Sequence, residues 1–267
     1  MANAWLLQPL PIVDVTTSGT LQMGTGLNVA NDYAGVICQL AMDGSGNGAY
    51  FRIDLGADTA FDTITAFGVE LAPPSTAVYV SYATAAQGPF TGDYTSVPTG
   101  VNAYAGSAPM SSGKGVTIWS LNAPVVARYV LISYGAGNSS ASVRISRLVI
   151  GQRIQLERNF TFGGTFGVKD LGSVDFSRRG VLLRQRGKKL RTTAITFSNQ
   201  RKDEVEAKTK PLIEQLGNTE MLAIVTDPTP DAQRQNRCYF GPLVGDLNHT
   251  WRNAAAWEWK VNLVSLF

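Results

Sequence analysis

The sequence predicts a mainly β protein with two domains and a single α-helix. Three observations carry this prediction. Short runs rich in Val, Ile, Tyr and Phe, typical of strands, alternate with turn segments rich in Gly, Pro and Ser. One charged segment, residues 200–217, has helical rather than strand periodicity. The length of 267 residues exceeds the common size of one domain, so each half is long enough to form its own core.

Charge divides the chain near Gln152. Residues 1–152 hold five basic and eight acidic side chains, whereas residues 153–267 hold 18 and 12, so we expect domains at 1–152 and 153–267. No apolar run is long enough to cross a membrane, and the N-terminus lacks the basic segment of a secretory signal. We therefore expect a soluble protein made in the cytoplasm. Cys38 and Cys238 lack metal-site spacing and are expected to be small buried residues.

Six β-type runs follow one another between Ala49 and Gly151. They are AYFRIDLG, TITAFGVEL, TAVYVSYA, VTIWSL, RYVLISYG and VRISRLVIG. Turn clusters such as APPS and AQGPFTGD separate them, and no helical pattern competes. This half of the chain is therefore predicted to be an antiparallel β-sandwich.

The order of these runs resembles the discoidin, or coagulation-factor C-type, galactose-binding-like jelly roll. The resemblance rests on the strand ending in Asp-Leu-Gly (49–56), the Arg-Tyr-Val strand (127–133) and the closing strand that ends in Gly (143–151). The chain differs in having Tyr50-Phe51 where the family often has Trp, and it lacks the terminal cysteine pair. The resemblance implies an N-terminal jelly-roll β-sandwich, and a host-surface glycan as one ligand to test.

Four side chains of this half are candidates for a site. Asp54 closes one strand and Arg128 opens another, which favours an ion pair between them over contact with a ligand. Tyr94 and Tyr104 are candidates for stacking on a sugar.

The segment DGSGNGAYFRID (43–54) has the spacing of a calcium loop. The candidate ligands are Asp43, Ser45, Asn47, Gly48 and Asp54. The flanks indicate a loop and a strand instead of two helices, and Gly, Ser and Asn are ordinary turn residues. A turn is favoured, and calcium is the alternative. No other cofactor is expected.

The second half is predicted to contain strands, one helix near 202–217, and more strands. Asp203 and Glu204 suit a solvated first turn, where they would cap the helix. Pro211 requires a kink or a fresh start. The expected buried stripe is Val205, Leu212, Ile213 and Leu216. The closing WEWKVNLVSLF alternates, so that Trp257, Trp259, Val261, Leu263 and Ser265 share one face of a strand.

This half resembles the tail-tube-like β-sandwich or barrel of tailed bacteriophages, in particular the hub domain of distal tail and baseplate proteins. The motifs are the basic hairpin RGVLLRQRGKKLRTTAITF (179–197), the helix starting Asp-Glu-Val (203–205), the Asp-Pro turn of MLAIVTDP (221–228), RCYFGPL (237–243) and the Trp-x-Trp strand (257–263). In well-known distal tail proteins the hub domain comes first; here the order is reversed.

The hairpin segment RRGVLLRQRGKKLR (178–191) carries seven basic residues and no acid, with Gly187-Lys188 expected near its tip. Three interpretations compete: a subunit interface, a solvated face and a nucleic-acid contact. Nucleic acid is disfavoured because no reading helix or stacking aromatics accompany the charges. The acidic first half is a candidate electrostatic partner on a neighbouring subunit. The expected interface residues are Arg184, Arg186, Lys188, Lys189 and Arg191.

Catalytic patterns are lacking in the sequence. His249 is the only histidine and is expected in a turn before a strand, and no Gly-x-Ser-x-Gly elbow occurs. We expect no catalytic residues and no enzyme. The sequence predicts a structural virion protein of a phage tail tip or baseplate, forming a ring of copies of itself with other tail proteins. The alternatives are a carbohydrate-binding module or adhesin recognising cell-surface glycans, and an accessory domain of an enzyme.

Overall fold

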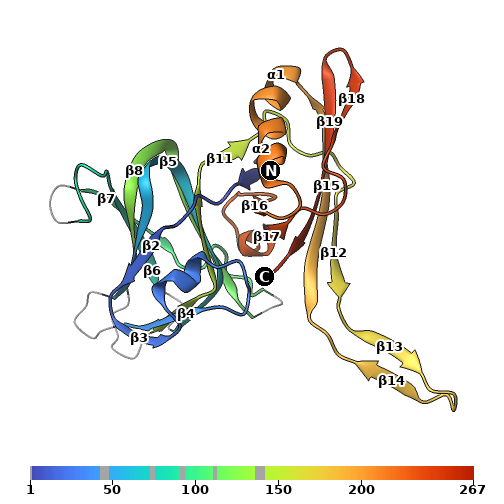
Figure 1. Ribbon diagram of the computed structural model, residues 1–267, viewed down its shortest axis with the longest axis horizontal. Coiled ribbons are helices and arrows are strands. Elements are labelled where there is room, and N and C mark those ends of the chain that lie inside the picture. Colours follow the sequence, from blue (N-terminus) through green and yellow to red (C-terminus); the bar gives the residue numbers. More distant parts are fainter. Residues whose placement is uncertain (1, 43–47, 73–75, 91–93, 111–112, 136–141) are drawn as a thin grey trace. The chain divides into compact units, whose positions relative to one another are not determined.

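The structure is a computed structural model, and it describes residues 2–42, 48–72, 76–90, 94–110, 113–135 and 142–267 (Figure 1). The chain forms two compact units. Unit 1 comprises residues 1–155 and 223–238, and unit 2 comprises residues 156–222 and 239–267. The first boundary lies close to the expected one at Gln152. Residues 223–238, which the sequence analysis assigned to the second half, belong to unit 1. No helix in the described ranges has the length and apolar character needed to span a membrane.

Unit 1 is a mainly antiparallel β-sandwich, as the sequence predicts. Its nine-stranded sheet has the order β3-β4-β9-β5-β8-β6-β7, with β2 and β10 also paired to β5. The bounds are β2 Asp14–Thr17, β3 Thr20–Met23, β4 Cys38–Ala41, β5 Ala49–Ala72, β6 Ala77–Ala83, β7 Thr95–Asn102, β8 Gly115–Gly135, β9 Ser142–Ile145 and β10 Arg147–Gly151. A short 3-10 helix, η1 (Gly26–Ala30), packs near β2 and β10.

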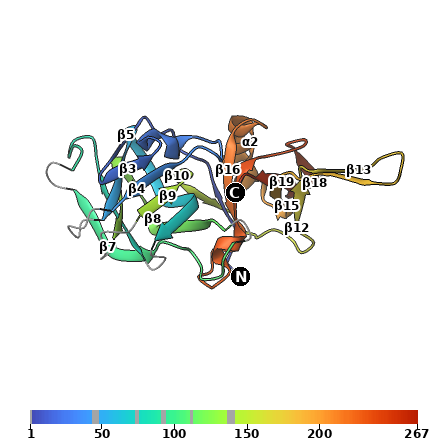
Figure 2. The same cartoon turned by 90° about the horizontal axis from the view of Figure 1, so that it is seen from below.

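Two long strands organise the sandwich (Figure 2). β5 and β8 each merge two of the predicted runs, because their pairing continues through register shifts between Asp54 and Thr59 and between Phe61 and Thr63. Such shifts bend a strand without ending it. The predicted run VRISRLVIG is divided instead, since β9 and β10 are separate strands on either side of Ser146. The core between the layers includes Phe51, Phe61 and Trp119.

Residues 223–238 join unit 1 through a smaller sheet. β1 (Trp5–Leu7) pairs antiparallel with β11 (Arg153–Gln155) on one side and with β16 (Met221–Val225) on the other. The segment then turns through η3 (Arg234–Arg237) into β17 (Cys238–Pro242). The turn is held by Arg237, which donates to the carboxylates of Asp227 and Asp231. Cys238 and Cys38 are both buried, which confirms the prediction for them.

Unit 2 contains a four-stranded sheet of order β12-β15-β19-β18, a hairpin β13–β14 and one helix. The bounds are β12 Thr165–Asp170, β13 Ser173–Phe176, β14 Leu182–Gln185, β15 Lys189–Gln200, β18 His249–Asn253 and β19 Ala256–Ser265. The predicted alternation of β19 is confirmed from Trp259 onward, since Trp259, Val261, Leu263 and Ser265 are all buried, whereas Trp257 is only partly buried. Trp259 stacks on Phe197 of β15, with ring centroids 5.7 Å apart.

The predicted helix is present as one continuous element with a π-helical turn at its centre. It runs through α1 (Lys202–Glu204), the π-helical η2 (Val205–Thr209) and α2 (Lys210–Leu216). The amide of Lys210 donates to the carbonyl of Val205, five residues back. Pro211 brings no amide donor and crowds an ordinary α-helix, so the wider turn before it explains how the helix accommodates it. The predicted stripe is buried, and Gly217 ends the helix at φ 51°.

One prediction for the helix is wrong. Glu204 does not lie in a solvated first turn: its side chain is buried, accepts a hydrogen bond from the amide of Glu157 at 2.9 Å and pairs with Lys208 at 3.2 Å. The residue before the helix, Arg201, makes no capping side-chain bond. The carboxylate therefore ties the helix to the segment that enters unit 2.

Candidate interaction surfaces

The first candidate surface is a β-ribbon in unit 2. The pair β12–β15 leaves the sheet and continues as the hairpin β13–β14, which extends away from the rest of the unit (Figures 1 and 2). Within the described ranges, neither hairpin strand pairs with a third strand. We call residues 165–189 the ribbon, and residues 190–200 of β15, from which it extends, its base. Every residue of β12, β13 and β14 is exposed to solvent.

The ribbon exposes more apolar surface than a solvated hairpin needs. Phe176 opposes Leu182, and Val174 lies two residues from Phe176, so the three side chains share one face. They are exposed to 64%, 52% and 65% respectively. Further exposed apolar side chains on the ribbon are Phe166, Val168, Leu171, Val181 and Leu183. A large exposed apolar patch usually marks an interaction site.

The tip of the ribbon is not where the sequence analysis placed it. The chain turns at Arg178, Arg179 and Gly180, where Gly180 has φ 76° and its amide donates to the carbonyl of Ser177. Gly187-Lys188 lies further back along the arm, since Leu171 donates to the Lys188 carbonyl at 3.0 Å. Gly180, which adopts this positive φ without strain, is the turn residue that the prediction missed.

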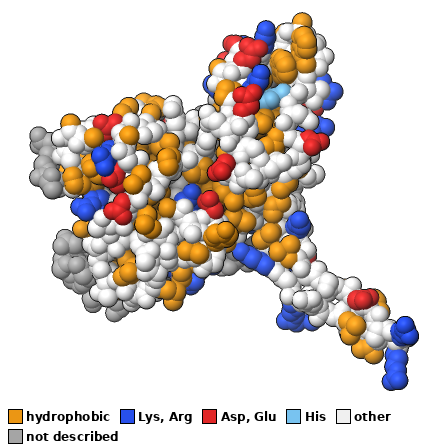
Figure 3. Space-filling model, in the orientation of Figure 1, with side chains coloured by type: hydrophobic (Ala, Val, Ile, Leu, Met, Phe, Trp, Pro, Cys, Tyr) orange, Lys and Arg blue, Asp and Glu red, His pale blue; other side chains and the backbone are white. Residues whose placement is uncertain are grey.

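The predicted interface residues all lie on the ribbon or at its base, in two environments. Arg184, Arg186 and Lys189 are exposed. Lys188 donates to the carbonyl of Leu266 at 3.0 Å, and Arg191 lies over the ring of Tyr239 at 4.3 Å. The latter two therefore hold the base of the ribbon to unit 2, while the first three remain candidates for a partner. Figure 3 shows basic and hydrophobic side chains together near the end of the ribbon.

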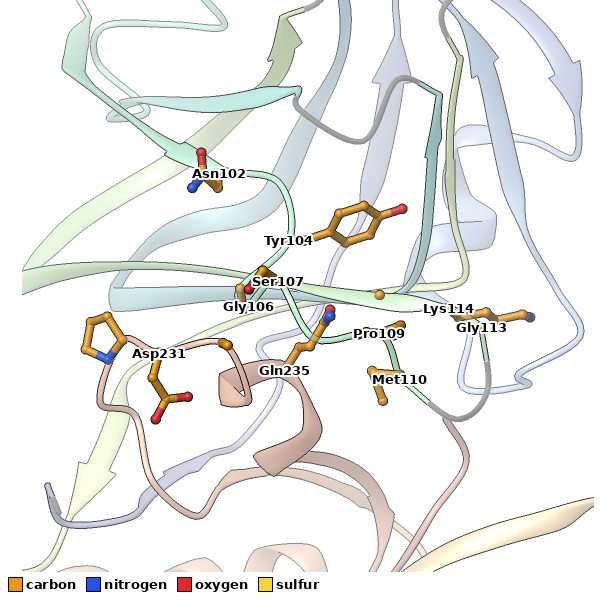
Figure 4. Close-up of a pocket in the computed structure, with 14 residues that line it drawn as sticks. Asn102, Tyr104, Gly106, Ser107, Pro109, Met110, Gly113, Lys114, Asp231 and Gln235 are labelled. Atoms are coloured by element: carbon orange, nitrogen blue, oxygen red, sulfur yellow. The ribbon is translucent and has the colours of Figure 1, made fainter.

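The second candidate surface is a pocket of about 820 Å³ in unit 1 (Figure 4). One wall comes from the end of β7 and the segment that follows it, with Asn102, Tyr104 and Ser107, and the other comes from residues 230–235. The Gln235 side chain joins the walls by donating to the carbonyl of Ala108 and accepting from the amide of Val116. This volume is in the usual range for a small-molecule site. The sequence analysis missed the second wall because it assigned that segment to the other half.

The four candidate residues that the sequence analysis named in unit 1, Asp54, Tyr94, Tyr104 and Arg128, all contact other side chains or backbone groups of the unit. Tyr104 lines it, and its hydroxyl accepts from the amide of Leu71 at 3.0 Å, whereas Tyr94 packs edge-on against Phe90. The predicted ion pair is confirmed: Arg128 donates to both carboxylate oxygens of Asp54, at 2.8 and 2.9 Å. This hydrogen bonding lowers the pKa of Asp54.

The calcium-loop candidates Asp43, Ser45 and Asn47 lie outside the described residues. Asp54 is described, and besides the pair with Arg128 it accepts from the amide of Gly56 at 2.7 Å. Among the residues that the structure describes, no group of three or more His, Cys, Asp or Glu is arranged to hold a metal ion.

The third candidate surface is a pocket of about 300 Å³ in unit 2, between the helix and β18. His249 is the first residue of β18. Its Nε2 atom forms a hydrogen bond of 2.8 Å with Thr209 Oγ1, and its ring stacks on Trp259. Burial, with the nearby charge of Lys210, lowers the pKa of His249. Beside it, Trp251 and Trp257 stack with ring planes 9° apart. The sequence analysis did not single out Trp251; its place opposite Trp257 depends on the β18–β19 register.

Comparisons with known proteins find similarity at the level of solved structures. No protein-family model and no curated protein matches the sequence. The family 32 carbohydrate-binding module of AlyQ, solved with 4,5-unsaturated mannuronic acid, is 17% identical, and the match covers 54% of this chain and 97% of that chain at a TM-score of 0.38.

Two further similar structures are carbohydrate-binding modules by their descriptions. The family 32 module of Clostridium perfringens NanJ, in complex with galactose, is 11% identical over 55% of this chain and 98% of that chain, with a TM-score of 0.39. Chitosan-binding module 1 from the chitosanase/glucanase of Paenibacillus sp. IK-5 is 11% identical over 54% and 95%, with a TM-score of 0.38. None of these three structures is a phage tail protein.

Proposed function

We propose that this chain is a structural subunit that assembles with copies of itself through the ribbon of unit 2. The observation that carries the proposal is the exposed apolar face formed by Val174, Phe176 and Leu182 on a two-stranded arm. An isolated two-stranded hairpin is marginal in water, because it has no apolar layer to pack against. A partner surface supplies that layer. Burial of each such side chain contributes roughly 1.5–3 kcal/mol.

Charge supports a copy of this chain as the partner. The ribbon holds seven basic and two acidic side chains, while unit 1 holds eight basic and ten acidic ones. Opposite net charges favour encounter between the ribbon of one copy and another copy's acidic surface. Nucleic acid is the less favoured partner, because the ribbon's exposed aromatics are few and the helix of unit 2 is nearly neutral.

The assembly we propose is a ring at the distal end of a bacteriophage tail, within the tail tip or baseplate of the virion. This narrower proposal depends on the resemblance of residues 179–263 to the hub domain of tail proteins. The ring would contact other tail proteins, and each subunit would carry unit 1 as an added sandwich module.

The test is the mass of the purified full chain and of a variant with residues 173–186 replaced by Asn-Gly, a pair suited to a two-residue turn. Mass photometry and sedimentation velocity are expected to give a discrete oligomer for the wild type and a monomer for the variant. Circular dichroism checks that the variant is folded. A wild-type chain that remains monomeric at tens of micromolar would contradict self-assembly; electron microscopy of the oligomer tests whether it is a closed ring.

A second candidate function is carbohydrate binding by unit 1. The pocket in Figure 4 favours it, because it combines the ring of Tyr104 with the exposed amide and hydroxyl of Asn102 and Ser107. Aromatic faces and polar side chains are suited to a sugar ring.

A glycan array followed by calorimetry tests this candidate. Tyr104→Ala and the exposed pair Asn102→Ala/Ser107→Ala are expected to lose binding, while Tyr94→Ala, outside the pocket, retains it. An array without signal for the wild type, or equal loss in the Tyr94 variant, would exclude this pocket as the binding site.

A further inference from the structure

The small pocket of unit 2 has the chemistry of a cation site. Its lining includes Trp257 from β19, His249, and the side chains of Glu206 and Glu214 on the exposed side of the helix. Trp251, stacked on Trp257, is 65% exposed. A guanidinium group binds well where an aromatic face and carboxylates lie together, because it stacks on the ring and donates to the oxygens.

Three cations lie on or near this pocket, and two of them have acidic partners. Arg252 donates to Glu258 at 2.6 Å, and Lys202 lies 3.8 Å from Glu206. Burial, with the nearby charge of Lys210, lowers the pKa of His249. Lys210 is the remaining cation in the lining. The lining residues themselves therefore carry two carboxylates and one ammonium group, a net charge of −1. Lys202 pairs with Glu206, and Glu214 takes part in no ion pair within the described part of the chain.

We propose that this pocket receives the Arg178–Arg179 tip of the ribbon from a second copy of the chain. The inference deepens the proposed function and rests on it. Two hydrogen bonds fix the turn at the tip: the Val181 amide donates to the Ser177 side chain, and the Ser177 amide donates to the Val181 carbonyl at 2.9 Å. Both arginines are exposed on this fixed turn. Pre-organisation reduces the entropy lost on binding.

The tip cannot enter the pocket of its own chain. Along β15, Arg191 pairs with Ser265 next to the ribbon, and Gln200 pairs with Trp257 at the other end of the strand. The ribbon extends from the Arg191 end of β15, and the pocket lies at the Gln200 end. Within unit 2 the ribbon therefore extends away from the pocket (Figure 1). The part of the ribbon from Asp170 to Arg179 is about 30 Å long if each residue adds the rise of a β-strand.

This placement specifies the type of contact. The tip and the pocket are different surfaces at opposite ends of one unit, so a tip-to-pocket contact is head-to-tail. A head-to-tail contact closes into a ring when its rotation is a fraction of a full turn. With such a rotation, the contact would assemble a ring of more than two copies.

Charge reversal tests the contact. Arg178→Glu/Arg179→Glu is expected to weaken assembly at least tenfold, as is Glu206→Arg/Glu214→Arg. An equimolar mixture of the two variants is expected to recover assembly with the variants alternating, because the reversed tip meets the reversed pocket and the wild-type tip meets the wild-type pocket. Lys260→Glu, an exposed reversal on β19, is the control and is expected to assemble as the wild type does. All four positions are exposed, and circular dichroism checks folding.

Crosslinking gives a readout that does not depend on affinity. A mixture of an Arg179→Cys chain and a Glu214→Cys chain, treated with a short bis-maleimide, is expected to give a heterodimer; the native cysteines are buried and stay unreactive. Assembly unchanged by both reversals, with no heterodimer, would overturn the tip-to-pocket contact. If the shortened ribbon variant is monomeric in that case, the proposed function survives; if it assembles as the wild type does, both proposals fail.

Discussion

The base and the end of one β-ribbon have opposite environments. At the base, β15 alternates: Ile195 and Phe197 are buried against β19, and Trp259 is fully covered. At the end, β14 has equally apolar residues, such as Leu182 and Leu183, with every position exposed. The backbone pairing is antiparallel in both. The difference teaches that strand pairing and apolar content do not by themselves bury a side chain; a second layer does, and only the base has one within its own unit.

The largest expected effect comes from removing a large side chain at the base. Trp259→Ala is expected to lower the free energy of unfolding of unit 2 by about 3–5 kcal/mol, because it leaves a cavity under Phe197. Phe176→Ala on the ribbon is expected to change it by less than about 0.5 kcal/mol in the monomer, because that ring contacts solvent. Urea unfolding followed by tryptophan fluorescence measures both. Equal losses would mean that the ribbon end is packed within its own chain.

The next effect concerns association. Val174→Ser/Phe176→Ser/Leu182→Ser removes the shared apolar face and keeps the ribbon length and charge. It is expected to weaken self-association at least 100-fold without lowering the melting temperature of the monomer. Ser173→Thr/Gln185→Asn on the other face is the matched control. Sedimentation equilibrium measures the association constants, and an unchanged constant in the triple variant would exclude this face from the interface.

A smaller effect is expected from the ion pair of unit 1. Arg128 lowers the pKa of Asp54, so the stabilisation by this carboxylate is present above the ordinary aspartate pKa and is lost as pH falls through the lowered value. Asp54→Asn is therefore expected to lower the melting temperature of unit 1 near pH 7, and its difference from the wild type is expected to shrink toward pH 3. Thermal unfolding across this pH range measures the effect. A difference that grows in acid would show that the pair is not ionic.

The smallest expected effect concerns the pKa of His249. His249 is the only histidine, so its imidazole gives one set of NMR signals. Burial and Lys210 are expected to place its pKa below that of an exposed histidine, so its contribution to stability is present above the ordinary pKa and declines as pH falls. Lys210→Gln is expected to raise the value slightly. A pKa at or above the ordinary value would mean that the pocket is open to water.

The sequence predicts those features that depend on local periodicity. The alternation of β19 and the buried stripe of the helix repeat every two residues and every three to four residues, so neighbours along the chain define the buried face. The environment of Glu204 could not be predicted in this way, because its hydrogen-bond donor is the amide of Glu157, 47 residues away. The same holds for residues 223–238: the pairing of β16 with β1 joins segments that lie at opposite ends of the sequence.

The candidate sites also differ in whether they depend on local patterns or on contacts between segments. Asp54 and Arg128 could be paired from the sequence because both flank strands of one sheet. The basic character of the ribbon was equally evident, but its tip was placed at the wrong glycine, since both Gly180 and Gly187 follow basic residues. The pocket in unit 1 was missed because its two walls are far apart in the sequence. The Trp251–Trp257 pair was missed because it depends on the register of the β18–β19 hairpin.

Amide hydrogen exchange tests the central claim most directly, since it reports the base and the end of the ribbon in one experiment. Mass spectrometry of the full chain is compared at a concentration where it is assembled and after dilution to the monomer. We expect peptides from 192–200 to be protected in both states, and peptides from 173–185 to be protected only in the assembled state. Ribbon peptides that exchange equally fast at both concentrations, in a chain shown by its mass to be oligomeric, would contradict the claim that the ribbon is the assembly element.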